Sequence, residues 1–136
     1  MEQQKKILVI EDDEDVRYLI GDSIKSSISE DIEIEEFEDA EAALIRCQQQ
    51  KYDLIITDFK LPGMDGFDLI RNIYRQPHHA TCPMIFISGY FTELEAAKHG
   101  KYFDYLTFID KPFETEQLVM HVKLKLYGED LKQDQE

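Results

Sequence analysis

Tryptophan is absent from this chain of 136 residues, and cysteine occurs only twice. Cys47 and Cys82 belong to neither a CxxC pair nor a metal-ligand spacing, which argues against a disulfide scaffold or a zinc site and indicates two reduced thiols. No apolar stretch approaches the roughly 20 residues that a membrane-spanning helix requires, and no signal-peptide pattern follows Met1. We therefore expect a cytoplasmic protein without a membrane partner.

Basic residues are also scarce: 15 lysines and arginines stand against 29 acids, for a formal net charge of −14. Little positive charge is left to compensate the phosphates of DNA or RNA, so direct binding to nucleic acid is not expected. Part of the acidic excess, over residues 30–41, is explained by a solvated face around an edge strand. The acids at 11–15 differ, because they directly follow an apolar run and concentrate negative charge at one point.

What the chain does contain is a regular alternation of apolar runs and helical patterns. Five runs predict β-strands at residues 7–11, 32–37, 53–57, 84–88 and 106–110. Helical spacing predicts helices at 14–27, between Ala40 and Cys47, between Leu69 and Pro77, at 92–100 and at 114–127. This alternation predicts an α/β fold whose parallel sheet is covered on both faces.

The segments between these elements carry further expectations. Gly128 is expected to end the last helix, so that residues 1–128 form one domain and 129–136 a polar tail. Residues 61–66 are expected to form a loop in which Asp65 caps the next helix. His78 and His79 have no partner at metal-ligand spacing and are expected to be solvated.

Four of the predicted strands end in groups that ionise or form hydrogen bonds: Glu11 with Asp12, Asp58, Ser88 and Lys111. In an open parallel sheet, ligands bind at the carboxyl ends of the strands. Each group has an ordinary alternative when taken alone, since Asp58 suits a turn cap, Lys111 a surface lysine and Ser88 a buried hydroxyl. Together, three acids, a hydroxyl and an ammonium predict a pocket for a divalent cation and an anion, which is suited to phosphoryl transfer.

The same residues carry a family resemblance. The segments are ILVIEDD at 7–13, DLIITDFKLPGMDG at 53–66, ISG at 87–89 and DKPF at 110–113. In order and spacing they resemble the receiver domain of two-component response regulators, over residues 6–127. The resemblance implies a flavodoxin-like, doubly wound five-stranded parallel sheet of order 2-1-3-4-5, with five helices in three layers.

The resemblance also implies a phosphoryl-accepting site. Asp58 would accept a phosphoryl group from a sensor histidine kinase or a histidine phosphotransfer protein. Mg²⁺ would be bound by Asp12, by Asp58 and by the backbone carbonyl of Lys60, with Glu11 acting through a water. The chain would then be a signalling receiver and not a turnover enzyme.

Phosphoryl oxygens would be held by Lys111, by the hydroxyl of Ser88 and by the amides of Phe59 and Gly89. The Lys111–Pro112 bond is expected to be cis, again by resemblance. Lys60 and Tyr90 would tune the lifetime of the phosphorylated state, because the corresponding family positions flank the line of water attack.

The family's switch corresponds here to Ser88 and Phe108, with Phe108 swinging inward when the hydroxyl turns toward the phosphoryl group. The face formed by the fourth helix, the fifth strand and the fifth helix would bind a downstream partner or a second copy. Its lysines favour an acidic partner or self-association: Lys98, Lys101, Lys123 and Lys125.

Two other functions are compatible with parts of this pattern. An aspartate-nucleophile phosphatase of the haloacid-dehalogenase type needs a second aspartate two residues after the nucleophile, where this chain has Lys60. A phosphate-independent binding module on the same fold would be favoured by loss of an acidic-pair residue, of Asp58 or of Lys111, and all of these are present. The few residues after Tyr127 favour a stand-alone receiver over one excised from a longer regulator, and the full reading frame decides between them.

Overall fold

The computed structural model describes residues 4–89 and 105–134. Its main sheet has five parallel strands: β1 (Lys6–Ile10), β2 (Glu33–Phe37), β3 (Leu54–Asp58), β6 (Met84–Ser88) and β7 (Leu106–Asp110). Their spatial order is β2-β1-β3-β6-β7, so the doubly wound order predicted from the sequence is confirmed.

The burial of each strand follows its sequence. All four apolar residues of β1 and the first four residues of the central strand β3 are buried, as expected where both faces of a sheet are covered. Strand β2 contains three glutamates together with Ile34 and Phe37. Every residue of this strand is half-buried or exposed. The order of the sheet places β2 at one edge and β7 at the other.

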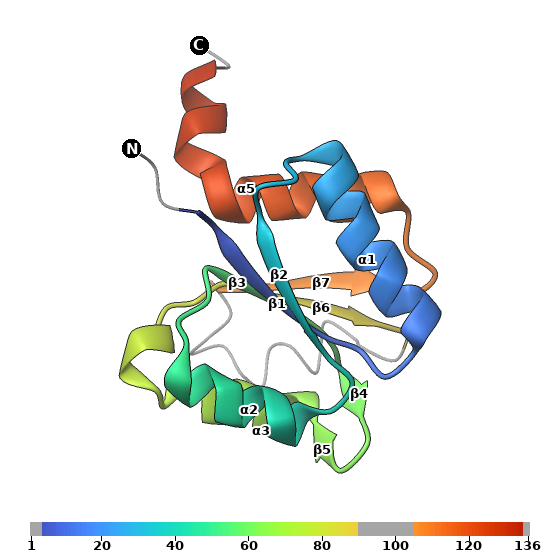
Figure 1. Cartoon of the computed structure of the whole chain (residues 1–136), viewed down its shortest axis with the longest axis vertical. Coiled ribbons are helices and arrows are strands. Elements are labelled where there is room, and N and C mark those ends of the chain that lie inside the picture. Colours follow the sequence, from blue (N-terminus) through green and yellow to red (C-terminus); the bar gives the residue numbers. More distant parts are fainter. Residues whose placement is uncertain (1–3, 90–104, 135–136) are drawn as a thin grey trace.

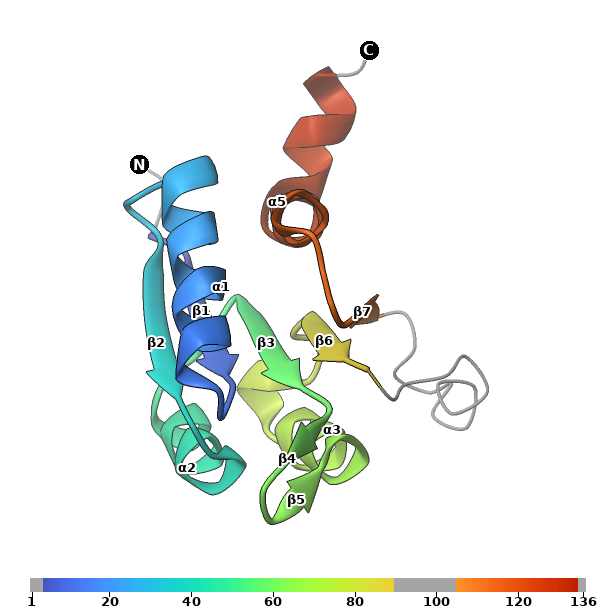
Figure 2. The same cartoon turned by 90° about the vertical axis from the view of Figure 1, so that its right-hand side faces the viewer.

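Helices cover both faces of the sheet (Figures 1 and 2). Helices α1 (Glu14–Ser27) and α5 (Thr115–Asp134) pack on one face, through a core that contains Ile20, Ile24, Leu118 and Val122. Helices α2 (Ala40–Gln49) and α3 (Gly66–Tyr74) cover the other face through a second core. The part of the chain that the structure describes has these four α-helices, and the predicted helix at 92–100 lies outside it.

Aspartates begin three of these helices, because their side chains satisfy backbone N–H groups that have no partner inside the helix. Asp13 accepts from the amides of Asp15 and Val16 at the start of α1. Asp39 does the same for α2, and Asp65 for α3, which confirms the predicted cap at Asp65. These caps fix where α1 and α3 begin, close to the ends of β1 and β3.

The segment after β3 differs from the predicted loop. Lys60–Leu61 (β4) and Met64–Asp65 (β5) pair as a short antiparallel ribbon. Gly63 turns the chain between them with φ of 80°, a conformation that favours glycine over residues with a side chain. This ribbon begins two residues after Asp58, the last residue of β3.

The predicted end of the last helix at Gly128 lies within one residue of a break in helical geometry, but the chain is helical again beyond that break. Helical geometry breaks one residue earlier, at Tyr127 (φ −134°, ψ 25°), and helix α5 then continues to Asp134. The sequence GEDLKQD contains no proline and several good helix formers, so nothing in it prevents the helix from resuming. Among the described residues, no helix is long and apolar enough to span a membrane.

The prediction of a solvated histidine pair is wrong for His79. Pro77–His79 forms a 3₁₀ helix, η1, and His79 is completely buried. Its Nε2 accepts a hydrogen bond from the Tyr52 amide at 3.0 Å, and its Nδ1 lies 2.8 Å from Gln76 Oε1. His78 is exposed as predicted, although its Nε2 lies 2.6 Å from the carbonyl oxygen of Cys47.

Candidate functional site

Polar groups from three of the four predicted strand ends contact one another, and Lys111 joins the other two. Lys111, just after β7, places its Nζ 3.1 Å from Glu11 Oε1 and 2.7 Å from Asp58 Oδ2. Glu11 follows β1 and Asp58 ends β3, so Lys111 contacts residues that lie 100 and 53 positions before it in the sequence. This contact follows from the parallel pairing of the sheet, which brings the carboxyl ends of its strands to one edge.

Three carboxylates gather at this edge. Glu11, Asp12 and Asp58 each offer an oxygen that lies within 4.8 Å of the others. At about 4 Å and an effective dielectric constant near 20, two such charges repel by roughly 4 kcal/mol. Oxygen donors at this separation fit a divalent cation such as Mg²⁺, which is bound by one or two carboxylates together with water and phosphate oxygens.

The carboxylate of Glu11 is almost removed from solvent, with its side chain 2% exposed, compared with 11% for Asp58 and 30% for Lys111. This burial raises the pKa of Glu11 above its usual value, against the opposing effect of Lys111. Burial also opposes the charge on Lys111, but its hydrogen bonds to Asp58 and Glu11 outweigh that cost and raise the pKa of its ammonium. Lys111 is therefore held as a cation between two acids.

The chain around Asp58 fixes the direction of its carboxylate. The amide of Lys60, at the start of β4, donates to Asp58 Oδ1 at 3.0 Å. Asp58 Oδ2 accepts a hydrogen bond from Lys111, so the two carboxylate oxygens are held by donors from two different segments of the chain. The Lys111–Pro112 bond is cis, which confirms that expectation.

Arg17 also supports the site, and nothing in the sequence singled it out. It donates from helix α1 to the backbone carbonyl of Glu11 at 2.8 Å. The amide of Asp13 lies 3.4 Å from Glu11 Oε2.

The remaining predicted residues are only partly described. Ser88 ends β6 in register with Asp110, but its side chain and all of Tyr90 lie outside the described part of the chain. Gly89 is exposed, and a Cβ built on it would lie 4.0 Å from Lys111 Cβ, so its backbone lies beside the Lys111 side chain. The ring of Phe59 is turned into the core and is 7% exposed.

The predicted switch residue, Phe108, lies on β7 and is half-buried. Its ring stacks on that of Phe86 in the neighbouring strand, with centroids 5.7 Å apart and an interplanar angle of 16°. The lysines predicted at 98 and 101 lie outside the described residues, whereas Lys123 and Lys125 are half-buried on α5.

This geometry agrees with comparisons to known proteins. The family model "Response regulator receiver domain" matches residues 7–123. The chain is 31% identical, over 121 residues, to the phosphate regulon transcriptional regulatory protein PhoB of Rhizobium meliloti (strain 1021). That match covers 89% of this chain and 52% of PhoB, so the chain spans about half the length of this relative. It is also 32% identical to an uncharacterized 14.6 kDa protein of Leptolyngbya boryana, with 85% of this chain and 88% of that protein covered.

Solved structures show the same fold. The chemotaxis response regulator CheY4 of Vibrio cholerae matches with a TM-score of 0.78 at 23% identity, covering 91% of this chain and all of that one. The receiver domain of NtrX from Brucella abortus matches with a TM-score of 0.73 at 29% identity, covering 88% and 97%. With the family model extending from the first strand into the last helix, the chain belongs to the response regulator receiver domain family.

Proposed function

We propose that this receiver takes a phosphoryl group from the phosphohistidine of a sensor histidine kinase or a histidine phosphotransfer protein onto Asp58, and thereby changes its affinity for a downstream protein. The observation that carries this proposal is the contact of Lys111 with both Asp58 and Glu11 at the meeting point of three strands. A lysine that merely balanced surface charge would not need two acids from different strands, one of them 2% exposed.

In the proposed reaction, an oxygen of Asp58 attacks phosphorus, the phosphorus–nitrogen bond of the donor breaks and the imidazole leaves. The Lys60 amide holds one oxygen of Asp58, which limits the directions in which the carboxylate can point. Lys111 moves from the carboxylates to the phosphoryl oxygens, where its charge is needed. Bound Mg²⁺, held by Asp12, Asp58 and the Lys60 carbonyl with Glu11 through a water, would neutralise charge on the phosphoryl group.

Acetyl phosphate, a small-molecule phosphoryl donor, tests the proposal directly. With Mg²⁺ present, the intact mass of the protein is expected to rise by about 80 Da, the mass of one HPO₃. The Asp58→Asn variant should show no such gain, because an amide does not form the acyl phosphate. Release of free phosphate from many organic phosphates would instead indicate a phosphatase, and an unchanged mass in Mg²⁺ would indicate a phosphate-independent binding module.

The acidic cluster also predicts a linkage between metal and stability. Mg²⁺ should raise the melting temperature by mass action, because the cluster binds it only when folded. Asp12→Asn should weaken that effect, yet raise the melting temperature in chelator by a few degrees, because it deletes one of three repelling charges. The measurement is a thermal melt of both proteins with and without chelator. A lower melting temperature of Asp12→Asn in chelator would contradict a crowded acidic site.

We further predict slow self-dephosphorylation. The side chain of Lys60 is exposed and offers no carboxylate or amide to orient an attacking water, and Tyr90 is a bulky residue at the other flanking position. The Lys60→Asn/Tyr90→Glu double variant is therefore expected to lose phosphate faster than the natural protein. Decay of the phosphorylated mass over time measures this, and equal or faster decay of the natural protein would show the prediction to be wrong.

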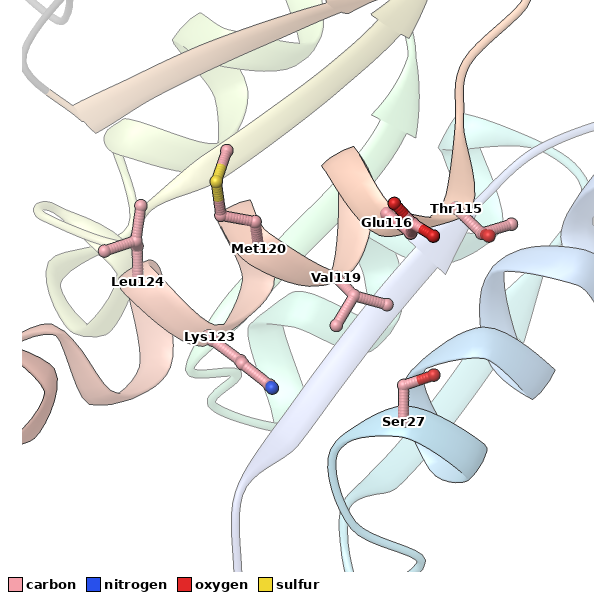
Figure 3. A pocket seen from close by; sticks show the side chains of 7 residues that line it. All are labelled: Ser27, Thr115, Glu116, Val119, Met120, Lys123 and Leu124. Carbon is pink, nitrogen blue, oxygen red and sulfur yellow. The ribbon is translucent and has the colours of Figure 1, made fainter.

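The partner surface is proposed to include β7 and α5. Helix α5 exposes Met120 and Leu124, the side chains of which are 50% and 45% exposed. Both lie beside a groove of about 560 Å³ between α5 and the end of α1, where Lys123 and Ser27 also line it (Figure 3). Apolar side chains beside Lys123 suit an acidic protein partner or a second copy better than nucleic acid, given the net charge of −14.

A further inference from the structure

Aromatic rings connect the region of Asp58 to Phe108. Phe59, the residue after Asp58, contacts the ring of Phe86 at 5.6 Å between centroids and an interplanar angle of 71°. Phe86 in turn stacks on Phe108 at 5.7 Å and 16°. Phe86 thus contacts one ring beside the phosphorylation site and one ring at the switch position.

Phe86 is well placed to transmit a displacement. It is completely buried on β6, where its Cα is in register with Phe108 of β7 and Thr57 of β3. Protein interiors are close-packed, so a fully buried ring between two others has little free space in which to absorb a shift of either neighbour.

Phe59 also packs tightly against the start of α3. A Cβ added to Gly66 would lie 2.3 Å from Phe59 Cδ2, so the ring already sits directly on the backbone at the start of α3. Phe67 packs edge-on against Phe59 with centroids 4.8 Å apart and an interplanar angle of 85°. A displacement of Phe59 is therefore resisted by α3, and the contact between Phe59 and Phe86 makes Phe86 a neighbour that must adjust to it.

We infer that Phe86 is a positioning residue that couples the Asp58 site to Phe108. It holds the Phe108 ring against the sheet before phosphorylation and passes on changes in the position of Phe59. The inference rests on the proposed function for its biological meaning, because Asp58 must be the group whose state changes. The coupling itself is a property of the three rings and is measurable without phosphate.

The test uses Phe86→Leu, which keeps an apolar side chain and removes the ring. The readout is the NMR signal of the Phe108 ring in protein with ¹³C-labelled phenylalanine, assigned by its loss in Phe108→Leu. Ile87→Leu is the matched control, because Ile87 is buried on the same strand but packs in the other core. Phe86→Met serves as a second variant if Phe86→Leu does not fold.

The first arm needs no phosphorylation. Phe59→Leu is expected to shift the Phe108 signal in the natural background and in Ile87→Leu. In Phe86→Leu the same change should produce less than about half of that shift, because residues that communicate through a shared neighbour lose their coupling when it is removed. Equal shifts in all three backgrounds would overturn the inference.

The second arm adds Mg²⁺ and acetyl phosphate. Phe86→Leu should gain the same mass as the natural protein, while the phosphorylation-induced shift of Phe108 falls to less than about half. A full shift in Phe86→Leu would overturn the inference, since a merely structural role leaves that shift unchanged. If no protein gains mass, the proposed function fails, and the first arm still decides whether the rings are coupled.

Discussion

Replacing Lys111 with methionine is expected to lower the free energy of unfolding by about 3 kcal/mol at pH 7 in chelator. The ammonium lies within hydrogen-bonding distance of two acids, and one of them, Glu11, is 2% exposed. Methionine keeps most of the apolar stem but leaves Glu11 and Asp58 with no charge to oppose their own. Removing one partner of a buried ion pair costs more than the pair contributes, because the other charge stays buried. Urea unfolding monitored by circular dichroism measures the loss.

The loss should depend on pH in a definite direction. Burial already raises the pKa of Glu11 in the folded protein, and loss of Lys111 raises this pKa further. A carboxyl group whose folded pKa lies above its unfolded pKa binds more protons when folded. Its contribution to stability is therefore present at low pH and lost as the pH rises through the folded pKa. The difference between Lys111→Met and the natural protein should shrink between pH 7 and pH 5.

Lys25→Met provides the matched control. Lys25 is exposed in the last turn of α1, and its replacement changes the net charge by the same amount. We expect this variant to lose less than about 0.5 kcal/mol. A loss in Lys111→Met no larger than that in Lys25→Met would show that the ammonium does not compensate a buried acidic site.

The sheet and the candidate site were predictable from the sequence because each part has a local signal. A buried parallel strand gives a continuous apolar run in the sequence. A polar residue that directly follows such a run can be identified from the sequence alone. Once the strands are placed in parallel, Glu11, Asp58 and Lys111 must come to one edge, and the 2.7 Å and 3.1 Å contacts of Lys111 agree with this. The resemblance supplied the strand order, which apolar runs alone do not specify.

The features that sequence reasoning missed depend on side-chain packing across elements. Phe86 reads only as one more apolar residue of a strand, and its importance comes from the rings on either side. Arg17 reads as a solvated helix residue until its contact with the Glu11 carbonyl is seen. The helical segment beyond Tyr127 contains several good helix formers, which offset the low helix propensity of Gly128.

The burial of His79 also depends on packing across elements and was not predicted from the sequence. Between pH 7.5 and pH 5, the natural protein is expected to lose about 2 kcal/mol more stability than the His79→Gln variant. Burial lowers the pKa of His79 from 6.5 to about 4, with smaller contributions from His78 and Lys51. The ring must stay neutral, because Nε2 accepts the Tyr52 amide and has no room for a proton of its own.

The sign follows from proton binding in the two states. Below pH 6.5 the unfolded chain protonates His79, whereas the folded protein does so only near pH 4. Stability from this group is therefore fully present above pH 6.5 and is lost as the pH falls toward 4, by about 3 kcal/mol in total. Glutamine does not titrate, and its carbonyl oxygen can still accept a hydrogen bond, so His79→Gln should lack this slope whatever its stability at neutral pH.

His78→Gln separates this effect from a general loss of histidine. His78 makes only a smaller contribution to the lowered pKa of His79, so the His78→Gln variant should keep most of the slope of stability against pH. The glutamates and aspartates titrate in all three proteins, so the differences between them isolate the histidine. Urea unfolding at intervals from pH 7.5 to pH 5 gives the slopes. Parallel curves for the natural protein and His79→Gln would mean that the folded state admits a proton on this ring as readily as the unfolded chain does. The buried acceptor for the Tyr52 amide would then contribute nothing to acid sensitivity.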